Sequence, residues 1–237
     1  MVDNGTTNHY HVRLDPATFL APIVIDVPAD KGVAALDPLA FGPQPICPPL
    51  AIVDINWFDN YLDTTVIPAL AAQGVNLSTL SIFLGRNLNL AFFASPTNLS
   101  VCCIAGYHST EAGLPTQTYV VANFETSGFY GPSFSDTVIL SHEVAEWMND
   151  PFFPLNPTPP WGVVQVPGFC QNSLEVGDPL GAGGGFDYPP IVMPNGFNYH
   201  LQELAFFSWF YGAPSIGIHG WFSNNGTFVT DAGPPCQ

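Results

Sequence analysis

Positive charge is the scarcest property of this chain of 237 residues. Lys and Arg together number three, against 19 Asp and Glu, so the formal net charge is -16. Nucleic acids and anionic membrane surfaces are bound through clusters of Lys and Arg. The composition therefore argues against both as partners. It also leaves any buried carboxylate with few protein cations to pair with.

Long apolar runs, linkers and repeats are also missing. Residues 204–222 are apolar, but helix-breaking and polar residues interrupt them, so we expect no membrane span there. No low-complexity linker or internal repeat divides the chain. A single domain over residues 1–237 is expected, with a sheet and helix part to about residue 150 and an irregular, loop-rich part over 151–237.

Paired cysteines of the Cys-x-x-Cys kind that hold structural zinc are absent. The cysteines are Cys47, Cys102, Cys103, Cys170 and Cys236. Together with 25 Pro and 22 Gly, they are typical of a secreted protein with two disulfides and one odd thiol. The adjacent Cys102 and Cys103 allow either two separate bridges or a bond to each other.

The start of the chain shows no apolar leader, because residues 1–4 are polar. We expect that a leader has been removed and that the protein is secreted; the alternative is a cytosolic protein. The shortage of Lys and Arg also suits an acidic exterior. Few positive charges remain to repel one another once the carboxylates are protonated.

A helix ending at residue 150 is the most informative segment that is present. Ser135 and Asp136 offer N-cap oxygens, and Pro151 forbids continuation. Apolar side chains occupy nearly the whole circumference between these limits, so the helix is expected to be buried. The buried helix also carries one imidazole and two carboxylates, whose charges must be paired or bound to a metal ion.

The spacing His142-Glu143-x-x-Glu146 is that of the zinc motif His-Glu-x-x-His with Glu in place of the second His. Residues four apart lie on one helix face, so His142 and Glu146 would ligate Zn²⁺, with Glu143 as the general base for a bound water. A free Glu is protonated only below about pH 4.3, and a free His below about 6.5, which favours metal retention in acid. The alternative is a core helix whose polar groups bond locally.

A third ligand must come from elsewhere in the chain. Gluzincin-type enzymes place a ligand Glu downstream of the helix motif, which favours Glu175, with Asp178 orienting the ligand histidine. The competing candidates are His108, His200 and His219. A polar turn is the alternative for the segment that holds Glu175.

The segment Gly106-Tyr107-His108 offers two further candidates. Either His108 or Tyr107 would stabilise the oxyanion of a tetrahedral intermediate. With Glu143 as the base, these residues would complete a catalytic set for hydrolysis.

The remaining patterns predict an α+β fold with a mixed sheet. A helix is expected over 57–73, capped by Asn56 and kinked at Pro68. Strands are expected within 8–27 and over 77–84, 100–108, 118–125, 163–166 and 199–210, and a Pro-rich loop over 28–50. This order is compatible with a zincin-like domain, in which an edge strand beside the buried active-site helix receives the substrate backbone.

Four blocks together resemble a known family. They are Ser141–Glu146, Gly106–His108, Glu175–Asp178 and Trp221–Asn224. Such blocks resemble those of secreted bacterial proteins that are distantly similar to the plant EXORDIUM/phosphate-induced proteins. The resemblance covers scattered parts of residues 100–225 and implies a zincin-type, metallopeptidase-like domain.

The combined expectation is a secreted, acid-active zinc metalloendopeptidase. It would act as a monomer on a protein or peptide substrate, with His142, Glu146 and Glu175 holding the ion. One alternative is a non-catalytic extracellular or cell-surface binding protein with a zincin-like fold and an empty or calcium-binding site. Another is a glycoside hydrolase that pairs Glu143 with a distant carboxylate such as Asp178 or Asp187.

Overall fold

The computed structural model describes residues 12, 15–39, 43, 46–95, 98–110, 117–131, 134–152, 157–162, 170–180, 188, 190–224 and 236. Within them the fold is mixed α+β, with several small sheets and few helices. The strands are β1 (Gly32–Ala35), β2 (Leu50–Asp54), β3 (Ser81–Arg86), β4 (Leu88–Ser95), β5 (Asn98–Ile104), β6 (Gly106–Thr110), β7 (Thr118–Phe124), β8 (Pro157–Gly162), β9 (Cys170–Ser173), β10 (Pro190–Val192) and β11 (Asn198–His200).

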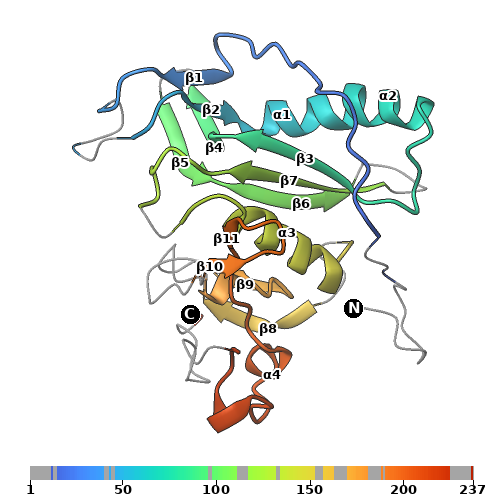
Figure 1. Ribbon diagram of the computed structural model, residues 1–237, viewed down its shortest axis with the longest axis vertical. Coiled ribbons are helices and arrows are strands. Elements are labelled where there is room, and N and C mark those ends of the chain that lie inside the picture. The colour runs from blue at the N-terminus through green and yellow to red at the C-terminus, as the bar shows by residue number, and fades with distance from the viewer. Residues whose placement is uncertain are drawn as a thin grey trace.

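Two sheets fill the upper half of the molecule (Figure 1). One has the order β1-β2-β4-β5, and β2 and β4 in it are parallel while the outer pairs are antiparallel. The other has the order β3-β7-β6, with β3 parallel and β6 antiparallel to β7. The antiparallel pairs β8-β9 and β10-β11 lie in the lower half. These mixed sheets confirm the expected α+β class.

The helical segment after β2 has three parts. They are α1 (Ile55–Tyr61), the π-helical turn η1 (Leu62–Val66) and α2 (Ile67–Ala72). The N-cap is Asp54, whose carboxylate accepts from the N–H of Asn56, so the cap lies two residues before the expected one. The π turn directly precedes the start of α2, where Pro68 cannot donate a backbone hydrogen bond. The expected helix is thus confirmed, and its irregularity is the π-helical turn that ends two residues before Pro68.

Strand β7 explains how the layers are stacked. All but its last residue are buried, as expected for a strand covered on both faces. Tyr119 and Val121 pack in a cluster with the α1–α2 segment, whereas Val120 and Ala122 pack against Ile139 of the next helix. The three-stranded sheet therefore carries α1–α2 on one face and that helix on the other (Figure 1).

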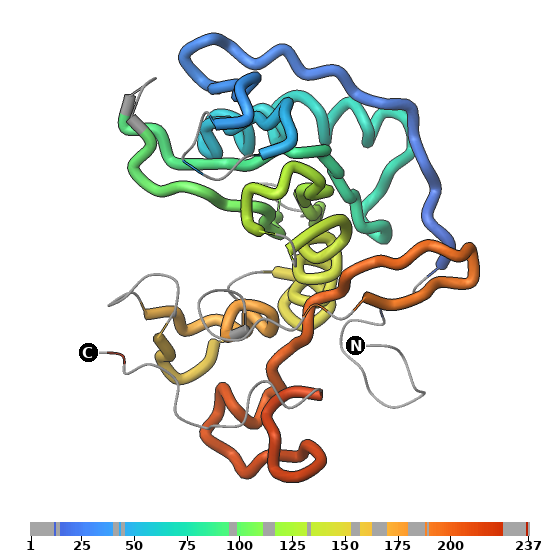
Figure 2. The backbone as a smooth tube through the Cα atoms, turned by 60° about the vertical axis from the view of Figure 1, so that its left-hand side comes forward, coloured from blue at the N-terminus to red at the C-terminus, as the bar shows by residue number. Residues whose placement is uncertain are grey.

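Helix α3 (Val138–Asn149) is the predicted buried helix. None of its residues is exposed. It lies between the sheets and the C-terminal segments in both views (Figures 1 and 2). On the C-terminal side, Ala145 packs against a second apolar cluster, here called the C-terminal cluster. Its members are Trp161, Leu174, Val176, Ala205, Trp209, Phe210 and Phe222.

Some strand predictions were wrong in place or extent. Strand β1 forms within the stretch expected to be loop, and β4 was not predicted. The single strand expected over 100–108 is two strands, β5 and β6, which belong to different sheets. The strands expected over 77–84 and 118–125 correspond to β3 and β7.

The strands predicted near the two ends of the chain are mostly not found in the described residues. Residues 15–31 contain no strand, and 163–166 lies outside the described residues. Of the expected strand over 199–210, only its start belongs to β11, and Phe207–Phe210 forms the short helix α4. Aromatic residues at this site pack into the C-terminal cluster as a helical turn, which overrides their strand propensity. The other short helices are η2 (Asp178–Leu180) and η3 (Ile218–Gly220).

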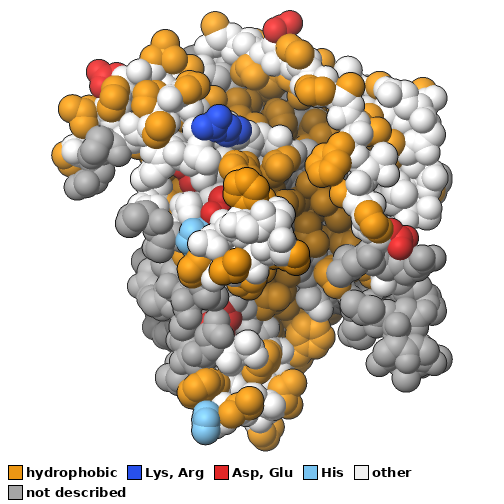
Figure 3. All heavy atoms as spheres, viewed as in Figure 1, with side chains coloured by type: hydrophobic (Ala, Val, Ile, Leu, Met, Phe, Trp, Pro, Cys, Tyr) orange, Lys and Arg blue, Asp and Glu red, His pale blue; other side chains and the backbone are white. Residues whose placement is uncertain are grey.

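The cysteines follow the predicted count. Cys170 is bonded to Cys236, Cys102 is bonded to its neighbour Cys103, and Cys47 is a free, exposed thiol. Lys and Arg are sparse on the face shown in Figure 3, much of which is covered by hydrophobic side chains. Among the described residues, no helix has the length and apolar character needed to cross a membrane.

Candidate metal centre

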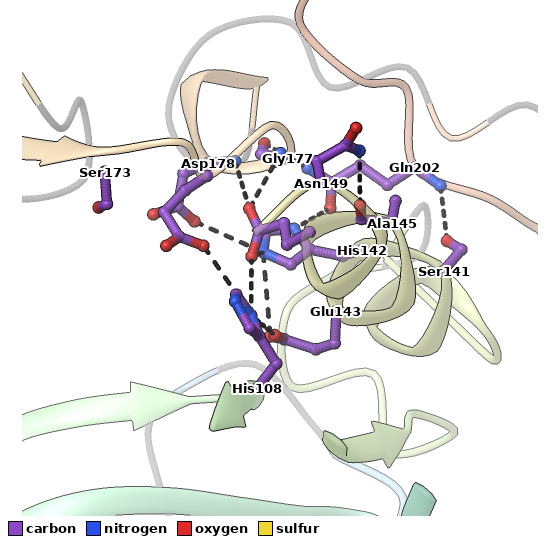
Figure 4. A network of polar contacts seen from close by, with 12 residues as sticks. His108, Ser141, His142, Glu143, Ala145, Asn149, Ser173, Gly177, Asp178 and Gln202 are labelled. Atoms are coloured by element: carbon purple, nitrogen blue, oxygen red, sulfur yellow. Dashed lines mark hydrogen bonds and ion pairs between the residues drawn. The ribbon is translucent and has the colours of Figure 1, made fainter. Parts of the chain in front are cut away.

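Three segments bring six ionisable side chains together between β6 and the C-terminal half (Figure 4). The side chains are His108 of β6, His142, Glu143 and Glu146 of α3, and Glu175 and Asp178 from the chain after β9. Five of them have side chains exposed by 3 to 10%, while Asp178 is exposed by 26% and forms the rim. The group is therefore a buried polar centre, and Asp178 is its most exposed member.

Helix α3 supplies the pair predicted from its spacing. His142 Nε2 lies 3.1 Å from Glu146 Oε2, one turn further along the helix. Glu143 lies between the two histidines: its Oε1 is 3.9 Å from His142 Nε2, and its Oε2 is 3.5 Å from His108 Nδ1. Glu143 thus adjoins both imidazoles at once.

Apolar anchors orient Glu175. Leu174 and Val176 on either side of it are buried in the C-terminal cluster. Glu175, between them, faces away from that cluster and toward the centre. Its Oε2 lies 3.9 Å from His108 Nδ1. Burial of two hydrophobic neighbours therefore holds this carboxylate in the centre.

Asp178 is held by a different contact. Gln171 of β9 donates a hydrogen bond of 2.7 Å from Nε2 to Asp178 Oδ2. The other oxygen, Oδ1, lies 3.5 Å from His142 Nε2. This nitrogen is the one directed toward Glu146, so Asp178 lies on the ligand side of the imidazole. The expected role of Asp178, orienting the ring through its other nitrogen, belongs to Gln202.

Gln202 determines which nitrogen of His142 carries the proton. Gln202 Nε2 donates to the carbonyl oxygen of Gly177 at 2.7 Å, so its Oε1 faces His142 Nδ1, at 2.8 Å. A carbonyl oxygen can only accept, so Nδ1 must be the protonated nitrogen. In the neutral ring, the lone pair of Nε2 is then directed toward Glu146 and Asp178, as a metal ligand requires.

Two glycines allow the segments to approach this closely. A Cβ on Gly177 would lie 2.5 Å from His142 Nδ1, and a Cβ on Gly106 would lie 2.5 Å from Ile139 Cγ2. The amide N–H groups of Gly177 and Asp178 donate to Glu146 Oε1 at 2.9 and 3.3 Å. These bonds leave Glu146 Oε2 free to face the histidines.

The possible metal ligands form two groups of three. One consists of His142, Glu146 and Asp178, and the other of His108, Glu146 and Glu175. In each group the ligand atoms lie within 4.8 Å of one another, and only Glu146 belongs to both. The predicted set of His142, Glu146 and Glu175 is therefore divided. Asp178 takes the third position beside His142, and Glu175 joins His108.

Charge makes these groups suitable for a cation. Burial and the nearby charge of Glu146 raise the pKa of Glu175 to about 12 and that of Asp178 to about 7. Burial also raises the pKa of Glu143, whereas at Glu146 the charges of His142 and His108 and hydrogen bonds from His142 and Glu175 together outweigh burial and lower the pKa to about 2. Burial alone would lower the pKa of His142, but the charges of Glu146 and Glu143 raise it well above its usual value.

Protein cations do not compensate these carboxylates. The described cationic side chains lie elsewhere: Lys31 pairs with Asp54 at 3.1 Å, and Arg86 donates to Thr126. Within the described part of the chain, the buried Glu175 Oε1 makes no hydrogen bond. A divalent cation would offset both deficits, since it favours ionised ligands and accepts lone pairs from buried oxygens. The imidazole and carboxylate donors are ones that zinc and related ions accept.

Tyr107 does not join the centre. It neighbours His108 on β6, so its side chain points to the opposite face of the sheet. There it packs against the α1–α2 cluster, with its ring 6.1 Å from that of Tyr119 in an edge-on contact. The expectation that Tyr107 stabilises an oxyanion was therefore wrong. His108 does face the centre, where it belongs to one of the two groups of possible metal ligands.

The two other candidate histidines also lie outside it. His200 pairs with Asp136, its Nδ1 lying 2.7 Å from Asp136 Oδ2, and His219 is exposed. Asp136 accepts from the N–H of Thr137, the N-cap of α3, and from the N–H of His200 at 2.7 Å. The N-cap prediction of Ser135 or Asp136 was therefore wrong, because Thr137 is the N-cap and makes no side-chain capping bond, while Asp136 joins the helix start to β11.

Comparison with protein-family models, with curated proteins and with solved structures found no match for this chain. The function is therefore inferred from the chemistry of the centre itself. Its donors, their burial and the orientation of His142 are the observations on which a functional assignment depends.

Proposed function

We propose that this protein is a metal-dependent hydrolase, specifically an extracellular zincin-like endopeptidase active in acid. The observation that carries the proposal is the orientation of His142, whose Nδ1 is held by Gln202 while Nε2 faces Glu146 Oε2 and Asp178 Oδ1. Three protein ligands of this kind leave a further coordination position for substrate or water. A zinc ion held by them would polarise a substrate carbonyl and make water more acidic.

Glu143 is the residue proposed to move the proton. It adjoins the His142, Glu146 and Asp178 group without belonging to it, and its side chain is 5% exposed. Burial raises the pKa of its carboxyl above the ordinary value, which brings it closer to the pKa that suits a general base and acid. Glu143 would take a proton from the attacking water and transfer it to the leaving amine.

The position of β6 supports a peptide substrate. Among the described strands β6 is the outer strand of its sheet, and it carries His108 beside α3 (Figure 1). An outer strand can pair with an extended peptide through its backbone, which would lay the peptide along the centre. Zincin-like domains place an edge strand beside the helix that carries the metal ligands. The position of β6 beside α3 therefore supports the zincin-like assignment.

Export and acid activity are supported by separate features. The bond between Cys170 and Cys236 is of a kind that persists in oxidising compartments. The three Lys and Arg residues limit charge repulsion when carboxylates are protonated. Glu146, the carboxylate common to both ligand groups, has a pKa lowered to about 2, so it stays ionised in acid and can keep a metal ion there.

The test combines metal analysis with a protease assay. Elemental analysis of the purified protein, Glu143→Gln and His142→Ala would accompany casein hydrolysis from acid to neutral pH. We expect metal in the first two proteins, reduced metal in His142→Ala, and a loss of kcat by about 10²- to 10⁴-fold in Glu143→Gln. His219→Asn, at an exposed site, is the matched control. A folded protein that binds no metal would overturn the proposal.

The number of oxygen donors favours a second candidate, a calcium-binding extracellular protein without catalysis. Four of the six groups in the centre are carboxylates, which calcium prefers to nitrogen ligands. In that case elemental analysis would find calcium, and casein and peptide libraries would remain uncleaved. Loss of hydrolysis in Glu143→Gln with zinc retained would decide for the hydrolase.

A further inference from the structure

The division of the ligands into two groups has a direct structural consequence. We propose that the centre binds two divalent cations side by side, with Glu146 as the shared ligand. One ion would be held by His142, Glu146 and Asp178, and the other by His108, Glu146 and Glu175. This inference rests on the proposed metal centre, but it does not depend on hydrolytic activity.

Distances separate the two positions. Zinc-ligand bonds of about 2.0–2.2 Å limit any two ligand atoms of one ion to a separation of about 4.4 Å. Around the first position, His142 Nε2 lies 3.1 Å from Glu146 Oε2 and 3.5 Å from Asp178 Oδ1. These separations fit one ion. The ligand atoms of His142, Glu146 and Asp178 all lie within 4.8 Å of one another, and His108 does not belong to this group.

The second position has its own imidazole. His108 Nδ1 lies 3.8 Å from Glu146 Oε2 and 3.9 Å from Glu175 Oε2. Glu146 Oε1 is engaged by two backbone N–H groups, so Oε2 is the oxygen that faces both histidines. An oxygen in that place can bridge two ions, as in centres that hold metals about 3.5–4 Å apart.

Glu143 adjoins both positions. Its two oxygens face different histidines, Oε1 toward His142 and Oε2 toward His108. A base placed in this way would lie beside a substrate held at either ion position. The geometry thus gives Glu143 the same role with two ions as with one.

Charge balance provides an independent argument. Glu143, Glu146, Glu175 and Asp178 carry four negative charges when ionised, and neutral imidazoles carry none. One divalent ion leaves two of these charges uncompensated in a buried site, whereas two ions neutralise them. Lys31 and Arg86, the described cationic side chains, contact residues outside the centre.

The environment of Glu175 is the observation that points most directly to a second ion. Its side chain is 7% exposed, and within the described residues its Oε1 makes no hydrogen bond. An ionised carboxylate with a buried oxygen that lacks a donor is costly unless a cation takes its lone pairs. Glu175 belongs to the His108 group and not to the His142 group, so an ion beside His142 alone would leave this carboxylate without a cation.

The test counts ions and asks whether they are adjacent. Metal-free protein would be titrated with Zn²⁺ by equilibrium dialysis, and a sample loaded with Mn²⁺ would be examined by electron paramagnetic resonance. We expect two equivalents of Zn²⁺ per chain and the spectrum of an exchange-coupled manganese pair. Glu175→Gln and His108→Gln should each bind one equivalent and show the spectrum of an isolated ion.

The number of bound ions distinguishes a failure of the second position from a failure of the proposed function. His219→Asn should retain two equivalents, and near-UV circular dichroism would establish that each variant is folded. One equivalent in the unmodified protein, or two in folded Glu175→Gln, would overturn the second position while leaving the hydrolase proposal intact. No bound metal would overturn both. Two equivalents without hydrolysis of any peptide would support the paired ions and count against the hydrolase.

Discussion

The imidazole of His142 is held by the side-chain amide of Gln202, with Nδ1 and Oε1 2.8 Å apart. The other end of that amide is anchored on the carbonyl of Gly177, whose N–H in turn donates to Glu146. These hydrogen bonds connect His142 to Glu146 through Gln202 and Gly177. The orientation of the His142 ring therefore depends on the position of the Gly177 backbone, and substitutions at Gln202 and Gly177 test this dependence.

Replacement of Gln202 by Ala should weaken metal binding without removing a ligand. The imidazole would lose the partner that fixes its tautomer and ring orientation, a change that typically lowers metal affinity about 10- to 100-fold. Competition with a chromophoric chelator would measure the change. Gln73→Ala is the matched control, because Gln73 contacts a backbone carbonyl on an exposed part of α2. Equal affinity in both variants would contradict the orienting role.

Gly177→Ala should disturb the centre through steric overlap. The added Cβ would lie 2.5 Å from His142 Nδ1, closer than real contacts allow. Overpacking of this kind costs about 1–3 kcal/mol of stability. We expect a lower midpoint in urea together with a weaker affinity for Zn²⁺. A variant as stable as the unmodified protein, with unchanged affinity, would show that the ring can move at no cost.

Removal of metal should lower the melting temperature. Chelation would leave the ionised carboxylates of the centre without a counter-charge, so the folded state loses the binding free energy that the unfolded chain cannot recover. Free metal at 100 times its Kd contributes about 2.7 kcal/mol. Differential scanning calorimetry with and without EDTA would measure the shift. His142→Ala, which loses one of the two ion positions, should show a smaller shift on chelation than the unmodified protein.

Asp136 gives a prediction about pH. Burial alone would raise the pKa of its carboxyl, but hydrogen bonds from His200 and Thr137 outweigh burial and lower the pKa. A carboxyl with a lowered pKa stabilises the fold above its unfolded pKa of about 3.9, and this stabilisation is lost as pH falls through the folded value. Asp136→Asn should therefore be less stable than the unmodified protein at pH 7.

The difference between these two proteins should shrink in strong acid, where both carry an uncharged side chain. Urea denaturation at neutral pH and well below the unfolded pKa would measure it. Asp37→Asn serves as the control, because Asp37 is exposed and accepts a hydrogen bond from the N–H of Leu39 within the same turn. A constant difference at all pH values would mean that the charge of Asp136 contributes nothing to stability.

Local spacing predicted the parts of the centre that one helix supplies. His142 and Glu146 are four residues apart, so their proximity follows from helical geometry and needs no tertiary information. The α1–α2 segment and β7 were predicted for the same reason, since their apolar patterns are local. Alternation along β6 places Tyr107 and His108 on opposite faces, so the sequence alone shows that only one of the two can face the centre.

The partition of ligands was beyond sequence patterns. Whether Glu175 joins His142 or His108 depends on how Leu174 and Val176 pack against residues much later in the chain. Gln202 belongs to no recognisable motif, and its role arises from a contact to a residue 60 positions away. Tertiary contacts of this kind carry no periodic signal, so they appear only once the layers are assembled.

The centre draws its ligands from both halves of the chain. His108 comes from the sheet that packs on α1–α2, whereas Glu175 and Asp178 come from the chain that is anchored in the C-terminal cluster. A bound ion would therefore link the sheet that contains β6 to the loop-rich C-terminal half of the chain. The two halves would then open as one cooperative unit when metal is bound, and as separate units of unequal hydrogen-exchange protection when it is removed.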